Sequence, residues 1–232
     1  MQTIELSTIL RYRAETTSGQ HIQGSEYVIA FDTDIVGMAD DGREIHLGSL
    51  KFCLLRLSLA LDQNADMTGI FHSYPVLSDL AEELYDFDFE EFTQEIADAF
   101  DETFPHEDIL LIRGVEVLPF ARGQRVGLSA VHRVCKDWDS GCGLMAIDIK
   151  PLQCDFDDRD DAAWNKLELD RFSLDPKQAQ DRLVAHFGGL GFRKVGSCPF
   201  MLRSAKLISI PVAELDVRRS VLIPAEFLNP AE

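Results

Sequence analysis

The sequence predicts a mixed α/β domain of the α+β kind, and three observations support this. Segments rich in β-branched and aromatic residues dominate the first 60 residues, apolar stripes at helical spacing follow over residues 76–100, and a strand–turn–helix pattern occupies residues 109–138. The 232 residues suffice for a substantial core. No internal repeat or low-complexity linker divides the chain, so we expect a single domain, 1–232, with residues 206–232 as a C-terminal extension packed on its edge.

Two strands are predicted near the N-terminus. Ser25–Met38 (SEYVIAFDTDIVGM) has the composition of a strand and leads into the turn ADDG. Glu44–Leu61 resumes the pattern, and Gly48 within it indicates a bend or bulge. Apolar residues lie on nearly every side of Lys51–Leu61, so a helix is the alternative for that part.

Two helices are predicted next, over Val76–Tyr85 and Phe89–Phe100. Their apolar stripes are Val76, Leu77, Leu80 and Leu84, and then Phe89, Phe92, Ile96 and Phe100. Between Asp86 and Asp108 there are ten acidic residues and no Lys or Arg. This negative surface is either a solvated helix face or a docking surface for a cationic substrate or partner.

The strand–turn–helix pattern begins with an apolar strand, Ile109–Val117. A turn at Pro119 ends the strand, because proline cannot donate to the ladder, and Arg122–Trp138 is predicted to form a turn and a helix. The buried stripe of the helix would be Leu128, Val131, Val134, Cys135 and Trp138. Another face carries Arg125, Ser129, His132, Arg133 and Lys136, and we expect His132 there to be a surface residue.

The rest of the chain alternates strands and helix. Gly143–Ile149 is predicted as a strand and the acidic stretch Asp155–Asp161 as an exposed loop. Asp175 is a suitable N-cap for a helix that begins at Pro176, and Gly191 is well placed to end that helix. Its inner stripe would be Ala179, Leu183, Phe187 and Leu190, and short strands would follow at Phe192–Val195 and Phe200–Leu202.

Composition and charge exclude several classes of function. A formal net charge of −18 argues against a general nucleic-acid binder, which must neutralise phosphates. No apolar stretch approaches the roughly 18 residues of a membrane span, and the N-terminus lacks the pattern of a signal peptide, so a cytoplasmic protein is expected. The five cysteines are scattered, with no CxxC pair and no zinc-type histidine pair, which indicates reduced thiols and no metal site.

A local basic island interrupts this acidic chain. Between Arg113 and Lys136 there are five Lys or Arg residues and one acid, Glu116. A strand that leads into a helix presents unpaired N–H groups at the helix N-terminus, and those groups bind phosphate. Neither GxxxxGK[ST] nor GxGxxG occurs, so the sequence supports an anion site of another kind. The alternative is an ordinary turn whose arginines are solvated.

At this junction the chain resembles the GNAT (GCN5-related) N-acetyltransferases. The resemblance rests on V-x-V-L-P-x-x-R-G-Q-x-V-G at Val115–Gly127 and on a helix-end pattern, x-Y-x-x-x-G-F in the family, at His186–Phe192. It covers about the last 100 residues before the tail. It implies a central mixed, mostly antiparallel sheet with helices on both faces. It also implies a strand that splays from its neighbour at the acyl-CoA site, followed by a loop that holds the pyrophosphate of acetyl-CoA.

The resemblance assigns site residues. Val117 and Leu118 would offer backbone groups to the pantetheine arm, and the pyrophosphate loop would comprise Arg122, Gly123, Gln124, Arg125, Val126 and Gly127. Arg125 replaces a family glycine. Phe187 replaces the family tyrosine that protonates the departing thiolate, so it keeps the ring at the cofactor site and loses the hydroxyl.

Candidates for proton transfer are few. Glu116, on the strand beside the acyl site, would be the catalytic base, and the alternative is an exposed or paired strand glutamate. His186 should point to a different face of its helix from Phe187. Cys135 belongs to the buried stripe, which argues against a covalent role.

The sequence thus predicts an N-acyltransferase that depends on acyl-CoA, with acetyl-CoA as the expected cosubstrate, and that transfers the acyl group directly to an amine. The acceptor would be a small-molecule or protein amine, and the acidic segment favours a cationic one. One alternative is a catalytically weak or inactive GNAT-like module that binds acyl-CoA or a protein. Another is an acidic protein that binds a basic partner. The N-terminal strands would either complete the sheet or pair with a second subunit in a homodimer, and the same two alternatives apply to the tail.

Overall fold

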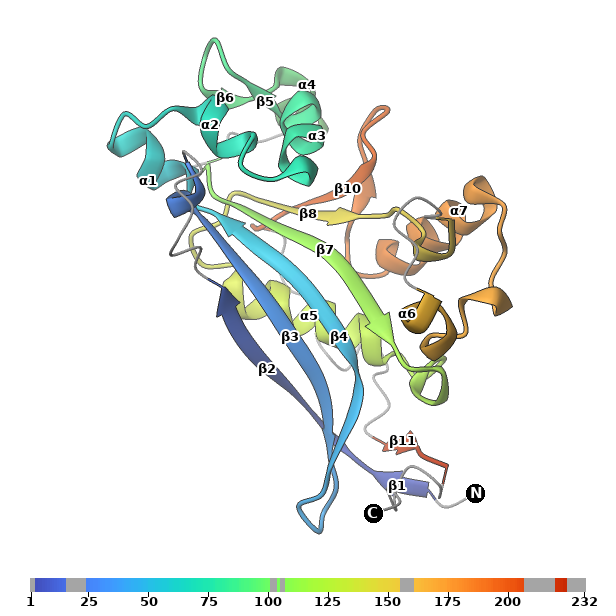
Figure 1. The fold of residues 1–232 in the computed structure, drawn as a ribbon. Coiled ribbons are helices and arrows are strands. Elements are labelled where there is room, and N and C mark those ends of the chain that lie inside the picture. The colour runs from blue at the N-terminus through green and yellow to red at the C-terminus, as the bar shows by residue number, and fades with distance from the viewer. Residues whose placement is uncertain are drawn as a thin grey trace.

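The computed structural model describes residues 3–15, 24–100, 104, 107–154, 161–206 and 220–224, and centres on a seven-stranded sheet (Figure 1). The strand order is β2-β3-β4-β7-β8-β10-β9. The strands are β2 (Ser7–Glu15), β3 (Val28–Met38), β4 (Glu44–Leu55), β7 (Ile109–Val117), β8 (Leu144–Asp148), β10 (Phe200–Ser204) and β9 (Arg193–Lys194). All neighbours are antiparallel except β7 and β8, which are parallel. The prediction of a mixed α/β protein with a mostly antiparallel sheet is therefore confirmed.

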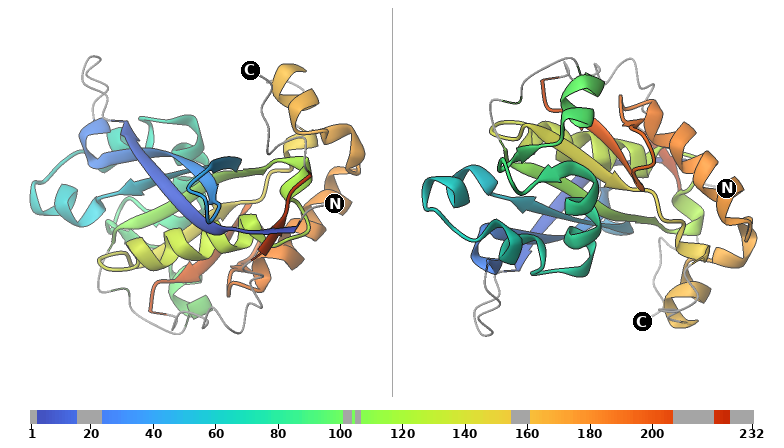
Figure 2. Two further views of the ribbon diagram at one scale, coloured as in Figure 1. Left: turned by 90° about the horizontal axis from the view of Figure 1, so that it is seen from below. Right: turned by 90° about the horizontal axis from the view of Figure 1, so that it is seen from above.

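Helices cover both faces of the sheet. Helix α5 (Val126–Trp138) packs on one face, which we call the α5 face. The opposite face, the α3 face, is covered by α1 (Leu57–Asp62), α2 (Met67–Phe71), α3 (Pro75–Leu84) and α4 (Gln94–Phe100). Helices α6 (Asp161–Lys166) and α7 (Pro176–Gly188) lie at the β8 side of the molecule, away from β3, in both views of Figure 2.

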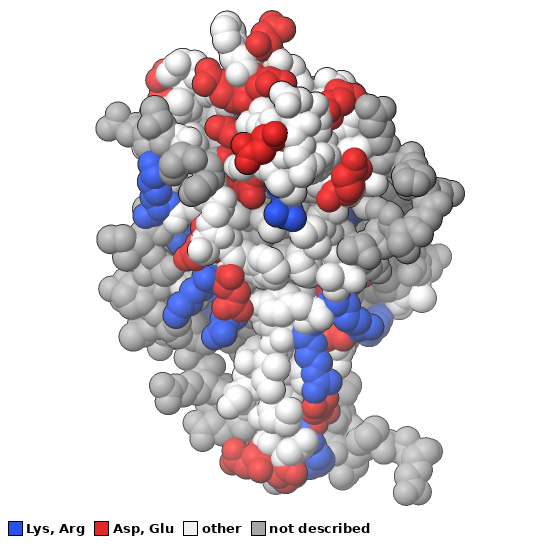
Figure 3. Space-filling model, turned by 90° about the vertical axis from the view of Figure 1, so that its left-hand side faces the viewer, with Lys and Arg blue, Asp and Glu red and all other residues white. Residues whose placement is uncertain are grey.

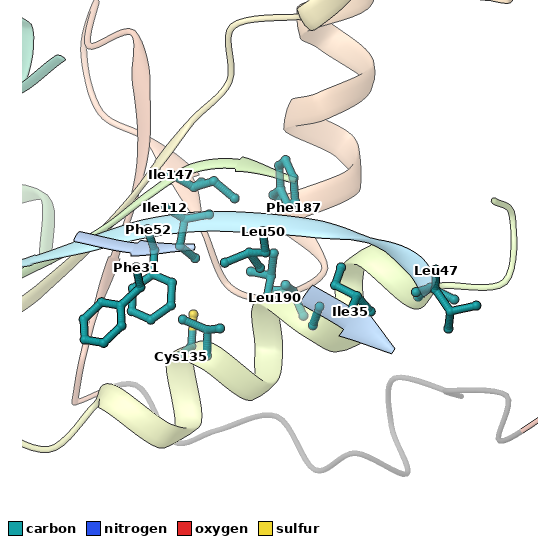
Figure 4. Packing of buried hydrophobic residues seen from close by; sticks show 14 of the residues in the cluster. Phe31, Ile35, Leu47, Leu50, Phe52, Ile112, Cys135, Ile147, Phe187 and Leu190 are labelled. Carbon is teal, nitrogen blue, oxygen red and sulfur yellow. The ribbon is translucent and has the colours of Figure 1, made fainter. Parts of the chain in front are cut away.

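Strand β7 divides the core between these two layers. Its side chains alternate, so Leu110 and Ile112 join the cluster on the α5 face while Ile109 and Leu111 join the cluster on the α3 face. All four are fully buried, as expected for a central strand covered on both sides. Figure 4 shows the α5-face cluster, where side chains of the sheet meet Cys135 of α5 and Phe187 of α7.

The first two predicted strands are present as β3 and β4, but both are shorter than predicted. Ser25–Tyr27 forms a short 3-10 turn before β3, and β4 ends at Leu55 because α1 begins at Leu57. The predicted irregularity at Gly48 is confirmed. Ile35 pairs with Gly48 and Val36 with His46, which leaves one extra residue in β4. A Cβ atom on Gly48 would lie 2.0 Å from the Glu116 carbonyl oxygen, so only glycine fits there.

The second predicted helical region is partly wrong. Helix α3 agrees with the prediction to within a residue, but the start of the segment Phe89–Phe100 belongs to a small hairpin of β5 (Tyr85–Asp86) and β6 (Glu91–Phe92). The Asp86 carboxylate accepts hydrogen bonds from the N–H groups of Asp88 and Phe89. Such a local turn competes with a helix. Phe89 is consequently 75% exposed and not part of a buried stripe.

The later elements are close to their predicted positions. The strand predicted at Gly143–Ile149 is β8, and Asp175 caps α7 by accepting hydrogen bonds from the N–H groups of Lys177 and Gln178. Helix α7 ends at Gly188, three residues before Gly191, which adopts φ +83° in the turn that follows. The strand predicted at Phe192–Val195 is reduced to β9, and most of the predicted acidic loop, residues 155–160, lies outside the described residues.

Part of the C-terminal extension packs beneath the turn that follows β7. Strand β11 (Ser220–Leu222) pairs with β1 (Thr3–Glu5), which leads into β2. Val221 and Ile223 are buried in the α5-face cluster together with Ala121 and Val126. Ala121 belongs to the short 3-10 turn η2 (Pro119–Ala121), so β11 and the residue after it support the backbone between β7 and α5.

The surface charge is unevenly spread. Figure 3 shows Asp and Glu side chains gathered at the top of the molecule, over the helical region between β4 and β7. Of the ten acidic residues predicted to form this surface, Asp101 and Glu102 lie outside the described residues. None of the helices in the described part of the chain has both the length and the apolar character needed to cross a membrane.

One half-buried acidic residue of this region has a buried oxygen atom. The Glu107 Oε2 atom is inaccessible and accepts no hydrogen bond from any residue that the structure describes. Burial, reinforced by the nearby carboxylates of Glu91 and Asp108, raises the pKa of Glu107 to about 7. Because the folded state holds this proton more tightly than the unfolded chain does, ionisation of Glu107 destabilises the fold.

We expect the free energy of unfolding to fall as pH rises from about 4.5 towards about 7, the window between the pKa values of unfolded and folded Glu107. Glu107→Gln should remove this part of the fall and stabilise the protein at about pH 8 by roughly 1–2 kcal/mol relative to wild type, a magnitude reduced for solvent screening. Denaturant unfolding at several pH values measures this. The exposed Glu82→Gln is the control. A parallel decline in Glu107→Gln and wild type would contradict the assignment.

Candidate functional site

The site lies where the two parallel strands part. Strands β7 and β8 are paired only from Ile109–Ile112 to Leu144–Ile147. Beyond this point β7 continues to Val117 against β4 alone. An irregularity in the β4–β7 pairing makes Arg113 the extra residue of β7, at the place where the strands separate. Figure 1 shows β7 and β8 diverging towards α6 and α7.

A cavity of about 850 Å³ occupies this gap. Its walls come from β7, the turn before α5, the first residues of α5, the end of β8 with the segment after it, and α7. Val115 and Val117 face α5, because their methyl groups would lie 3.3 and 3.2 Å from a Cβ atom on Gly127. Glu116 between them faces the opposite side, so the cavity is lined by groups from both faces of the sheet.

The turn between β7 and α5 brings backbone to the cavity wall. Gly123 and Arg125 both have positive φ angles, +72° and +60°, and both line the cavity. Arg125 is the N-cap residue of α5, and its own side chain makes no capping hydrogen bond. The N-terminal N–H groups of a helix carry partial positive charge, which favours an anion at this position. Gly127, in the first turn of α5, is buried against β7, so backbone approaches the cavity without a side chain between them.

Arg122 mainly fixes the walls of the cavity. Its Nε atom donates to the Val117 carbonyl at 2.9 Å, and an Nη atom donates to the Leu167 carbonyl. The guanidinium carbon lies 4.9 Å from the centre of the Phe172 ring. Burial lowers the pKa of Arg122. The side chain therefore ties the end of β7 to the segment between α6 and α7, and it lines the cavity from there.

The other residues assigned to the cofactor take different places. Gln124 donates from Nε2 to the Phe120 carbonyl at 3.0 Å, and Val126 is buried in the core, so neither lines the cavity. The Leu118 N–H donates to the Leu47 carbonyl at 2.9 Å, and the Val117 carbonyl is held by Arg122. Two of the backbone groups expected to meet pantetheine are thus already bonded.

Positive charge is concentrated around the cavity. Five Lys or Arg residues and two acidic residues line it, although the chain carries −18 overall. The cations are Arg113, Arg122, Arg125, Lys150 and Arg182, and the acids are Glu116 and Asp148. Such a local excess focuses positive potential in a concave, low-dielectric site and favours an anionic ligand.

Glu116 lies between the main cavity and a smaller one. The smaller cavity, about 90 Å³, is also lined by His46, Ser49 and Lys166. The Ser49 hydroxyl donates to Glu116 Oε2 at 3.2 Å. A space of this size holds a few water molecules. Glu116 is therefore partly buried, accepts a hydrogen bond and lines both cavities. A group that exchanges protons with a substrate and with solvent needs such access.

His186 and Phe187 both line the cavity but lie on different faces of α7, as expected, because His186 is exposed while Phe187 is buried in the core. The face of α7 towards the cavity consists of Ala179, Arg182, Leu183 and His186, which recur at helical spacing. Phe187 flanks that face, is buried in the core and has its ring centre 5.1 Å from that of His186. His186 is exposed overall, but the part of its ring that packs on the protein is removed from water. This loss of hydration lowers the pKa of His186.

For three further residues of α5, the burial in the structure can be compared with what the sequence predicts. His132, expected at the surface, is buried, so the covered face of α5 is wider than its apolar stripe predicts. Cys135 is buried as expected, and burial raises the pKa of its thiol to about 12, which keeps it protonated. Arg133 is exposed, pairs with Asp137 and does not line the cavity.

Sequence reasoning missed four charged residues of the cavity. Arg113 was counted in the basic island without a role, and Asp148, Lys150 and Arg182 were not considered. Asp148 could have been found, because it lies at the end of the strand predicted over Gly143–Ile149, the next strand after the splayed one. Arg182 could have been found from its helical spacing to His186. Lys150 gives no local signal.

No family model, curated protein or solved structure matches the chain. Among the residues that the structure describes, no group of three His, Cys, Asp or Glu side chains is placed to hold a metal ion. The functional interpretation therefore depends on the cavity and the residues around it.

The left-handed conformation of Arg125 gives a direct test of the turn. A residue with a Cβ atom is strained at φ +60°, whereas glycine is not. We expect Arg125→Gly to be more stable than Arg125→Ala by roughly 1 kcal/mol, and comparing these two variants cancels the loss of the guanidinium. Denaturant unfolding measures the difference. At the exposed helical position Arg133 the order should reverse, with Gly less stable than Ala by about 1 kcal/mol. The same order at both positions would contradict the turn geometry.

Proposed function

We propose that the protein is an acyl-CoA-dependent N-acyltransferase of the GNAT type, with acetyl-CoA as the expected donor. The observation that carries the proposal is a cation-lined cavity between two diverging parallel strands, next to a helix N-terminus. Its volume of about 850 Å³ falls in the range of small-molecule sites. The resemblance of Val115–Gly127 to the family motif fits the same place in the fold.

In this proposal the phosphates of the donor bind at the turn before α5. The N–H groups of the first turn of the helix, the backbone at Gly123 and the guanidinium of Arg125 meet at the cavity wall. The pantetheine arm would then extend along β7 towards Val115, where β8 no longer pairs with the strand. Local positive charge must overcome the repulsion between the negative chain and a polyanionic ligand.

The transfer needs no covalent enzyme intermediate. The acceptor ammonium gives a proton to Glu116, the neutral amine nitrogen attacks the thioester carbonyl, and the C–N bond forms as the C–S bond breaks. CoA leaves as a thiolate, and the second proton of the acceptor nitrogen is passed to that thiolate through water or through His186, so that an amide and a free thiol result. Glu116 returns its proton to solvent through the smaller cavity, whose walls it shares with Ser49.

Two residues favour a second candidate, an acyl-CoA-binding protein with little or no turnover. Phe187 has no hydroxyl to protonate the thiolate, and a general acid contributes typically about 10²–10⁴-fold. Arg125 places a side chain where the family has glycine, although its N–H group remains in the turn. Binding without turnover across a broad panel of amines would select this candidate.

Calorimetric titration tests the donor site. We expect acetyl-CoA and desulfo-CoA both to bind with micromolar affinity. Gly127→Glu should weaken binding at least about 100-fold, because it places a carboxylate at the helix N-terminus and crowds Val115 and Val117. Thr68→Glu, an equal charge change at an exposed position of α2, should bind like wild type. Absence of binding by the wild-type protein at several hundred micromolar would reject both candidates.

Turnover tests the base. In a thiol-release assay Glu116→Gln should lower kcat by about 10²–10⁴-fold while the Kd of acetyl-CoA stays within about twofold of wild type. Glu26→Gln, at an exposed position before β3, serves as the control. Unchanged kcat in Glu116→Gln would show that another group, or water alone, accepts the proton.

A further inference from the structure

The charged groups of the cavity divide between the two faces of the sheet. Ile147 belongs to the α5-face cluster and Ala146 to the α3-face cluster, so Asp148, the next residue of β8, points to the α3 face. Glu116 points there too, because Val115 and Val117 face α5. Arg113 and Asp148 are the first residues of their strands beyond the last parallel pair, so they flank the opening of the gap.

The α3-face side of the opening carries both signs of charge. Asp148 and Glu116 are the acids, and Arg113 with Lys150 provides cations in the same cavity lining. The Asp148 carboxylate accepts a hydrogen bond from the Lys150 N–H at 2.8 Å, and Glu116 accepts one from Ser49. Arg113 is exposed and makes no hydrogen bond or ion pair with the residues that the structure describes.

Asp148 is partly buried and lies close to charges of both signs. Burial raises the pKa of Asp148, and the charge of Asp79 on α3 raises it further, while Lys150 and Arg113 lower it. Lys150, Asp79 and Arg113 therefore all lie close enough to influence this one carboxylate, and Glu116 lines the same cavity. A site for a ligand with only a positive charge would need the acidic residues but not Arg113. A site for an uncharged amine would need neither acidic nor cationic residues.

The donor does not account for these groups. Its phosphates are assigned to the turn and helix N-terminus on the α5 face, where Arg125 and Gly127 lie. The mixed charges on the other side of the sheet remain for the acceptor.

We propose that the acceptor is a zwitterion of the amino-acid type, with a carboxylate that binds Arg113 and an amine that is held by Asp148 and Glu116; this rests on the function proposed above. An exposed guanidinium pairs with a carboxylate through two parallel hydrogen bonds. Asp148 and Glu116 attract the ammonium to the gap, and Glu116 then takes its proton. The wider acidic surface would repel the carboxylate, so Arg113 determines which amines are accepted.

The experiment compares amines that differ only in charge. Acetyl transfer from acetyl-CoA is measured by thiol release for the proteinogenic amino acids, for their α-carboxamides, for putrescine and for a lysine-rich peptide. The best amino acid should have a kcat/KM at least about 10-fold above its carboxamide, the discrimination expected from a hydrogen bond between charged groups. Arg113→Gln should bring that ratio close to one, and Arg56→Gln, at an exposed arginine before α1, should leave it unchanged.

Several results would overturn the inference while the proposed function stands. These are equal rates for acid and carboxamide, faster acylation of putrescine or of the basic peptide, or an acid preference that survives Arg113→Gln. If acetyl-CoA binds without turnover, calorimetric titration of the amino acid and its carboxamide into the desulfo-CoA complex applies the same criterion, and equal or absent binding overturns the inference. Failure of acetyl-CoA itself to bind would instead reject the proposed function, and the inference with it.

Discussion

The separation of β7 from β8 is the constraint on which the rest of the site depends. Inside the paired region, every residue of β7 from Ile109 to Ile112 is fully buried between two helical layers. After Ile112, β7 no longer pairs with β8 and is paired only with β4. A central strand cannot leave its backbone groups unpaired without a substitute, so the edge that β8 leaves must be met by side chains, as Arg122 meets the Val117 carbonyl, by water or by a ligand. The cavity is the direct consequence.

Contacts outside the cavity hold the segments that form its walls in place. Arg122 joins the end of β7 to Leu167 and Phe172, and Val221 and Ile223 pack beneath the turn from the far end of the sequence. Helix α7 forms the remaining wall and anchors it in the core through Phe187. The cavity is thus lined by segments between Arg113 and Gly189 that are far apart in the sequence, which explains why a local motif indicated only one of its walls.

The excess charge around the cavity is opposite in sign to the net charge of the chain. At −18 the chain as a whole repels a polyanion, yet five cationic side chains line the cavity between β7 and β8. Charges inside a concave site are screened less than charges on the surface, so the local potential prevails near the ligand. The two acids that share this cavity lie on the other side of the sheet from the helix N-terminus. This division separates the places for donor and acceptor in the proposed reaction.

The sequence by itself determined the α/β class, the order of the main elements from β3 to α7, the position of the strand–turn–helix junction and the cap of α7, because these depend on local periodicity, on turn chemistry and on glycine or proline at defined positions. It did not predict β2 or α2, and it failed at Phe89, where an aspartate turn displaced the helix, and at His132, whose surroundings come from other elements. Only the tertiary structure decided that β8 is parallel to β7 and leaves it after Ile112, and that Arg113, Asp148, Lys150 and Arg182 share one cavity. Those relations depend on strand register and on how α7 packs, and no local pattern encodes the distance between residues brought together by folding.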